Sequence, residues 1–108
     1  MRMWNVDPSK MCDQHLLGEH LECHMFVGSI NKGTSIQGFI DNGLLDLGTL
    51  RQRHDILVAE MLRRGMNHSS PLKPFEIPVH AATNMVSSEA NVAELIKRCP
   101  KCRILLQG

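Results

Sequence analysis

The sequence predicts an all-α protein, a compact single domain of three helices joined by irregular loops, and three observations lead to this prediction. The chain has 108 residues, the usual size of one domain and too few for two separate cores. Hydrophobic residues make up 43% and charged residues 21% of the chain, as in ordinary globular proteins. Apolar residues recur at steps of three and four in three segments. We therefore treat residues 1–108 as one domain.

The first predicted helix runs from about Pro8 to Asn31. Asp7 can cap free backbone amides, and the fixed φ of Pro8 suits a first helical turn. Gly33 is expected to stop this helix. The segment 34–48 is rich in glycine and is predicted to be a connecting loop with room for one further turn.

The second predicted helix begins after Thr49 and ends at Arg64, where Gly65 provides a left-handed cap. Its buried side is expected to carry Leu50, Leu57, Val58, Met61 and Leu62, and its outer side Arg51, Arg53, Arg63 and Arg64.

The third predicted helix follows a proline-rich connection. Three prolines between positions 71 and 78 disfavour both helix and central strand from 67 to about 79. Ser87 or Ser88 then caps a helix in which Val92, Leu95, Ile96 and Cys99 form one face, and Pro100 is expected to end it.

Charge is unevenly distributed along the chain. Residues 1–49 contain three basic and six acidic side chains, whereas residues 50–108 contain nine and five. This asymmetry is compatible with a basic face for a polyanion and equally with an evenly solvated surface.

The chain contains no apolar run long enough for a leader or a membrane span, so we expect a cytosolic protein. In that compartment its four cysteines, Cys12, Cys23, Cys99 and Cys102, are expected to be reduced thiols or metal ligands.

Several catalytic fingerprints are missing, including the nucleophile elbow, the P-loop, the zinc-protease helix and the dinucleotide-binding glycine motif. What remains is a polar stretch from Asp13 to His24. On a helix, His15, Glu19 and Glu22 would follow one ridge, and His20 and His24 would be one turn apart. A solvated helical face would have the same pattern.

Three blocks of the sequence carry a family resemblance: MRMWNVDP at the start, DQHLLGEHLECH from position 13, and LRQRHDILVAEMLRRGMNHSSPL from position 50. Together they resemble the pyrimidine-dimer DNA glycosylases with AP-lyase activity, the phage-type endonuclease V family. The resemblance implies a DNA-repair enzyme whose partner is double-stranded DNA with a damaged or abasic site, acting as a monomer without a cofactor or metal.

The resemblance also implies a mechanism in which an N-terminal α-amine is the nucleophile. Alignment places Met1 at that position, and Met1 is expected to be retained because Arg2 is too bulky for ordinary methionine removal. An α-amine titrates near about 7.7–8.0, so part of it is neutral and nucleophilic at cellular pH. The Met1 amine would form an imine with C1′ of the damaged nucleotide, and Glu22 would assist the β-elimination that cuts the strand.

Arg2, Gln14 and His15 match family positions of the DNA-contacting pocket and are predicted to bind phosphate or sugar oxygens. Two family arginines are replaced by Leu21 and Met25, which predicts weaker or redistributed phosphate binding. The aromatic C-terminal segment that contacts the dimer in the phage enzyme has no counterpart.

A second interpretation is a small zinc-stabilised, non-catalytic module that binds DNA or protein. Cys99 and Cys102 have half of a zinc-site spacing, and His20 and His24 could supply the other half. Alternatively, Cys99 packs inward and Cys102 is an ordinary residue of the C-terminal segment.

Overall fold

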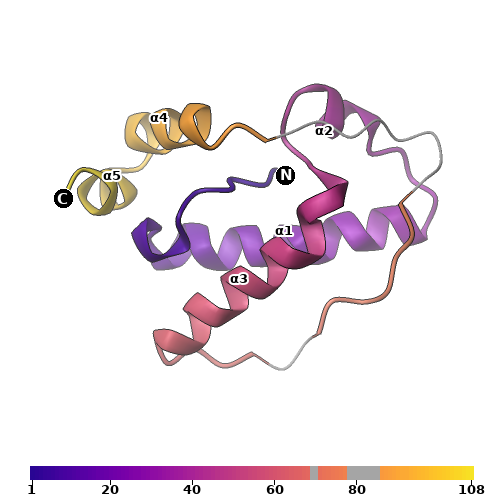
Figure 1. Cartoon of the computed structure of the whole chain (residues 1–108), viewed down its shortest axis with the longest axis horizontal. Helices are drawn as coiled ribbons and strands as arrows, with labels where there is room; N and C mark the ends of the chain where they lie inside the picture. The colour runs from indigo at the N-terminus through magenta and orange to yellow at the C-terminus, as the bar shows by residue number, and fades with distance from the viewer. Residues whose placement is uncertain (69–70, 78–85) are drawn as a thin grey trace.

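The computed structural model describes residues 1–68, 71–77 and 86–108 (Figure 1). Within these ranges the structure is helical and contains no strand. Two long helices, α1 (Asp13–Asn31) and α3 (Leu50–Arg63), pack against each other, and α4 (Ser88–Arg98) with α5 (Pro100–Gln107) lies across the N-terminal segment from them. The predicted all-α class is confirmed, but the described residues form five α-helices rather than three.

The first helix begins later than the sequence predicts. The Asp7 carboxylate accepts a hydrogen bond from the Ser9 amide, but the turn that it caps is a short 3-10 helix, Pro8–Lys10. Met11 and Cys12 then take extended backbone angles, and α1 starts at Asp13. Both residues are buried, so the break in the helix turns their side chains into the core.

The connection between α1 and α3 is more ordered than a plain loop. Gly33, with φ of 74°, follows the end of α1 and confirms the predicted stop. The short helix α2 (Gln37–Asp41) and a 3-10 turn (Leu47–Thr49) then follow. Ile40 and Leu47 are buried, which explains why this glycine-rich segment folds onto the protein.

Helix α3 confirms the predicted second helix and its stop, since Gly65 has φ of 81°. Leu57 and Met61 are buried as expected, but Leu62 is 56% exposed and its predicted burial is wrong. The outward prediction also fails for Arg53, which is 4% exposed. Apolar spacing alone could not find Arg53, because its burial depends on an acidic partner on another helix.

The last predicted helix is two helices. The Ser87 hydroxyl caps α4 by accepting from the Ala90 amide. Cys99 adopts an extended conformation, and Pro100 occupies the first turn of α5. Pro100 therefore ends one helix and begins another, because a proline that cannot continue a helix is well suited to start one.

The described part of the proline-rich connection, residues 67–68 and 71–77, has no regular secondary structure, as predicted; the rest of the predicted range, including Val79, lies outside the described residues. None of the helices in the described ranges is both long and apolar enough to cross a lipid bilayer.

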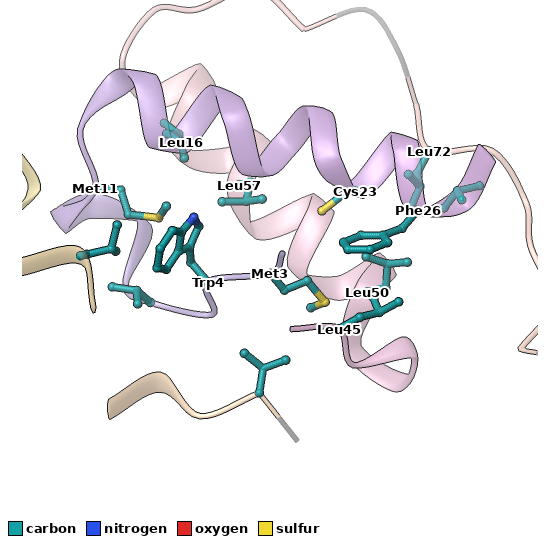
Figure 2. Close-up of a cluster of buried hydrophobic side chains, with 14 of the residues drawn as sticks. Met3, Trp4, Met11, Leu16, Cys23, Phe26, Leu45, Leu50, Leu57 and Leu72 are labelled. Atoms are coloured by element: carbon teal, nitrogen blue, oxygen red, sulfur yellow. The ribbon is translucent and has the colours of Figure 1, made fainter. Parts of the chain in front are cut away.

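The core lies between α1, α3 and the N-terminal segment (Figure 2). Phe26 and Leu16 from α1 pack in the same cluster as Leu57 from α3, and all three are fully buried. Met3 and Trp4 enter this cluster from the N-terminal segment, at 1% and 4% exposure. Burial of these two residues holds the start of the chain inside the protein instead of leaving it free in solvent.

Candidate active site

The N-terminal segment is fixed to its surroundings by backbone hydrogen bonds on both sides. The Met3 amide donates to the Leu44 carbonyl at 2.7 Å. From the other side, the Asn91 side-chain amide in α4 donates to the carbonyls of Met3 at 3.3 Å and Trp4 at 2.6 Å. Asn91 is 4% exposed and also accepts a hydrogen bond from the Arg2 guanidinium. These contacts define the position of the first residues.

A cavity of about 430 Å³ opens beside this segment. It is lined by residues of the N-terminal segment, of one face of α1 and of the end of α4: Met1, Arg2, Trp4, Gln14, His15, Gly18, Glu19, Glu22 and Arg98. All five residues that the sequence predicted for the site, Met1, Arg2, Gln14, His15 and Glu22, therefore lie around one cavity.

Glu22 is directly connected to the start of the chain. Its Oε2 accepts a hydrogen bond of 3.1 Å from the backbone amide of Arg2. The hydrogen bond places the carboxylate at the residue that follows Met1, and both Met1 and Glu22 line the cavity. Glu22 is half-buried, so its carboxylate is held by the fold but is not sealed from solvent.

Two arginines and a tryptophan form one side of the cavity. The Arg2 guanidinium carbon lies 4.0 Å from the centroid of the Trp4 ring, and that of Arg98 lies 5.2 Å from it. Burial, followed by the positive charge of Arg98, lowers the pKa of Arg2 from its ordinary value. Two cations stabilised by the same ring give this side of the cavity the charge that a phosphate group requires.

His15 faces both the cavity and a group of cysteines. Its ring lies edge-on to Trp4 at 5.8 Å between centroids, and its Nδ1 is 3.2 Å from the Cys12 sulfur. Burial and then the charge of Arg98 lower the pKa of His15, and Glu22 acts in the opposite direction. The lowered pKa of His15 favours the neutral imidazole. Gln14 is exposed at the cavity's edge.

Glu19 is a cavity residue whose partner the sequence analysis did not identify. It lies on the ridge with His15 and Glu22, as the helical spacing indicated, but it is 1% exposed. Arg53 of α3 donates two hydrogen bonds to its carboxylate, at 2.6 and 2.9 Å. This ion pair joins α1 to α3 directly beside the cavity.

The outward prediction is confirmed for Arg51 and Arg63, which are both exposed, and Arg63 forms an ion pair with Glu60. Arg51 donates to the backbone carbonyls of Leu72 and Lys73, although its side chain is exposed. Arg64 is half-buried and donates to the carbonyls of Pro8 and Met11. Most of this positive charge organises the fold.

Arg98 supplies cavity charge that no sequence pattern indicated. It lies at the end of α4, forms an ion pair of 2.7 Å with Glu94 and is 48% exposed. Only the folding of α4 against the N-terminal segment, at the other end of the chain, brings it to Trp4.

The cysteines and histidines form two groups rather than the single predicted set. Cys99 and Cys102 lie with Cys12 and His15, whereas His20 and His24 lie with His54 and His68. The predicted combination of Cys99, Cys102, His20 and His24 is therefore wrong. So is the alternative of an ordinary Cys102, which is fully buried. Cys23, also fully buried in α1, belongs to neither group, and burial raises its pKa to about 12.

Comparison with known proteins identifies the family of this chain. Residues 1–74 match the family of pyrimidine dimer DNA glycosylases. The match covers more than half of the chain, so the protein belongs to this family of DNA-repair enzymes, as the sequence blocks indicated. Helices α4 and α5, with Arg98 and Asn91, lie beyond the matched segment. No significant match was found among curated proteins or among solved structures.

Proposed function

We propose that this protein is a DNA glycosylase and AP lyase that acts on pyrimidine dimers through the amine of Met1 and the carboxylate of Glu22. The observation that carries the proposal is the 3.1 Å hydrogen bond between the Glu22 carboxylate and the Arg2 amide, at a cavity that Met1 also lines. The hydrogen bond holds the Glu22 carboxylate at the start of the chain, where it can exchange protons with a sugar that is bound beside the Met1 amine.

The reaction begins with attack of the neutral Met1 amine on C1′ of the damaged nucleotide. The N–C1′ bond forms as the glycosidic bond breaks, and the released pyrimidine remains joined to its neighbour through the cyclobutane ring. Opening of the sugar breaks the C1′–O4′ bond, and O4′ takes a proton. The Met1 nitrogen and C1′ are then joined by the double bond of an imine. Glu22 assists the proton transfers of this step.

The imine then makes strand cleavage possible because it withdraws electrons and acidifies the C2′ proton. A base, to which we assign Glu22, removes this proton, a C2′=C3′ double bond forms, and the C3′–O3′ bond breaks to release the downstream strand with its 5′-phosphate. Water hydrolyses the imine and restores the amine. Arg2 and Arg98 would bind the phosphates that flank the lesion.

A nucleotide must leave the base stack to reach such a cavity, and weakened pairing at a lesion lowers that cost. The cavity is lined by Arg2 and Gln14, whose side chains can donate hydrogen bonds to phosphate and sugar oxygens. We therefore expect attack on the sugar to occur in the cavity.

Borohydride reduction tests the proposal. Untagged protein mixed with DNA containing a thymine dimer or an abasic site should become covalently trapped, and mass spectrometry should locate the adduct on the peptide that begins with Met1. One residue added before Met1 should abolish trapping because it displaces the amine. A trapped lysine, or undiminished trapping with the added residue, would refute the role of Met1. The absence of any adduct would favour the non-catalytic binding module.

The role of Glu22 is tested by Glu22→Gln, which should lower strand cleavage by about 10²–10⁴-fold, the usual contribution of a general acid or base. Glu89→Gln is a matched control, because Glu89 is exposed in the first turn of α4 and does not line the cavity. Equal activity of both variants would contradict the assignment.

The cavity itself can be tested at Gly18, which lines it. A Cβ added at this position would have open space around it, with no other atom within 4 Å. Gly18→Met should fill the cavity and lower kcat/KM at least about tenfold, a loss of about 1.4 kcal/mol in transition-state binding. Gly28→Met is the control on the same helix, since Gly28 also has open space but does not line the cavity. Similar activity of the two variants would remove the cavity from the mechanism.

A further inference from the structure

Four ligand-type side chains converge between the start of α1 and the α4–α5 junction: Cys12, His15, Cys99 and Cys102. Their sulfur and nitrogen atoms all lie within 4.8 Å of one another. The Cys12 and Cys99 sulfurs are 3.9 Å apart, and the His15 Nδ1 lies 3.2 Å from the Cys12 sulfur and 3.6 Å from the Cys102 sulfur.

These distances match those of a metal site and not those of a disulfide. A disulfide holds its sulfurs about 2.05 Å apart. A tetrahedral zinc ion with Zn–S bonds of about 2.3 Å holds two sulfurs about 3.8 Å apart. Three buried cysteines and one histidine are the ligand set of a closed structural zinc site.

The backbone around the cysteines supports thiolate ligands. The Cys12 amide points to the Cys102 sulfur at 3.3 Å, and the Cys102 amide points to the Cys99 sulfur at 3.4 Å. Amide donors of this kind stabilise the negative charge that a thiolate carries at a metal centre. All three cysteines are at most 9% exposed, so water cannot stabilise that charge.

We propose that Cys12, His15, Cys99 and Cys102 bind one structural Zn²⁺ ion. The ion would join α5 and the end of α4, which lie outside the family-matched segment, to the first turn of α1. Because α4 carries Arg98 and Asn91, this link would hold the cavity's second arginine and the anchor of the N-terminal segment in place.

A different group of residues independently carries a second metal site. His20 and His24 of α1, His54 of α3, and His68 all place a ring nitrogen within 4.8 Å of the others. The Nε2 atoms of His24 and His54 are 3.2 Å apart. A tetrahedral ion at about 2.0–2.1 Å from each nitrogen would hold them about 3.3–3.4 Å apart.

The unsatisfied polar atoms of this group point to a ligand. The Nε2 atoms of His20 and His68 are buried and have no hydrogen-bond partner among the described residues, which is costly unless a cation accepts their lone pairs. On the opposite edge of His54, Nδ1 lies 3.0 Å from the Asp55 carboxylate. A carboxylate at Nδ1 is the usual orienting partner of a histidine that binds metal through Nε2. We infer that these four histidines bind a divalent transition-metal ion.

Metal analysis tests both sites. Untagged full-length protein is kept reduced and dialysed against metal-free buffer without chelator. Elemental mass spectrometry should then find two metal ions per chain. Cys102→Ser and His68→Gln should each lower this value to one. Cys23→Ser should leave it at two, because Cys23 is a buried cysteine outside both groups.

Cobalt reconstitution keeps the proposals testable if a variant fails to fold. Refolding of the wild-type chain with Co²⁺ should give strong sulfur-to-metal charge-transfer absorption from the cysteine site and a second, thiolate-free d–d spectrum from the histidine site. Wild-type protein with no bound metal and no cobalt spectrum would overturn both assignments. If the wild type holds one ion and only one of the two variants loses it, the site of the other variant would be overturned. Neither outcome depends on strand cleavage, so the metal sites and the proposed function can fail separately.

Discussion

The buried ion pair between Arg53 and Glu19 provides a severe test of the reasoning about the fold. Their side chains are 5% and 0% exposed, and two hydrogen bonds join them. Replacing Arg53 with methionine keeps much of the volume but leaves the Glu19 carboxylate without either donor. The Glu19→Leu/Arg53→Met double variant removes both charges and preserves apolar packing between α1 and α3.

The expected magnitudes separate these two variants clearly. Breaking a buried ion pair by removing one partner costs about 3–5 kcal/mol, whereas replacing both partners by apolar residues of similar size is often close to neutral. A domain of this size has an unfolding free energy of about 5–15 kcal/mol. With about 4–8 °C per kcal/mol for a small domain, Arg53→Met should lower Tm by at least about 12 °C.

Urea and thermal unfolding followed by circular dichroism measure these differences. Arg103→Gln is the control, because Arg103 is exposed on α5 and donates to the backbone carbonyl of Ile96 rather than to an acid. We expect its unfolding curve to coincide with that of the wild type. A loss below about 1 kcal/mol for Arg53→Met, or a double variant less stable than the single one, would refute the view that an unpaired buried charge dominates the cost.

Three further predictions concern other parts of the structure. Hydrogen bonds from Arg63 and Arg64 lower the pKa of Glu60 to about 2. The ionised Glu60 therefore stabilises the fold fully above about pH 4.5, and this stabilisation is lost as the pH falls through 2. In urea unfolding, the difference in unfolding free energy between wild type and Glu60→Gln should narrow over that range. Asn91→Ala should cost about 1–3 kcal/mol in unfolding free energy by leaving buried carbonyls without donors, and a wild-type stability would contradict this. A strong chelator should lower the wild-type Tm by about 10 °C or more in a thermal scan, and a Tm insensitive to chelator would contradict metal-linked stability.

The helices that the sequence predicts well are those with local stop and start residues. Gly33 and Gly65 end α1 and α3 where expected, since a positive φ at these positions favours glycine. Ser87 caps α4 for an equally local reason. Helix α5 could not be predicted in the same way because Pro100 is compatible with ending a helix and with starting one, and the choice depends on burial of Cys102 against the start of α1.

The part of the candidate site that lies on α1 and on the N-terminal segment could be predicted from the sequence. His15, Glu19 and Glu22 line the cavity together because helical spacing places them on one ridge. The partners from other helices could not be predicted in this way. Cys12 and His15 meet Cys99 and Cys102 from opposite ends of the chain, and no spacing rule connects them. The ligand types are visible in the sequence, but tertiary packing decides their grouping.

The replacement of two family arginines also has a structural counterpart. Leu21 and Met25, which replace the two arginines, are 59% and 46% exposed on α1. Apolar side chains therefore lie on the surface where the resemblance predicts positive charge. Around the cavity, the cations come instead from Arg2 and from Arg98 of α4. Under the proposed function, phosphate binding depends on a helix outside the family-matched segment, and the cysteine group lies where the end of that helix meets the start of α1. Loss of the Cys102 ligand should thus weaken binding to abasic DNA, whereas Leu21→Arg should strengthen it without altering the metal content.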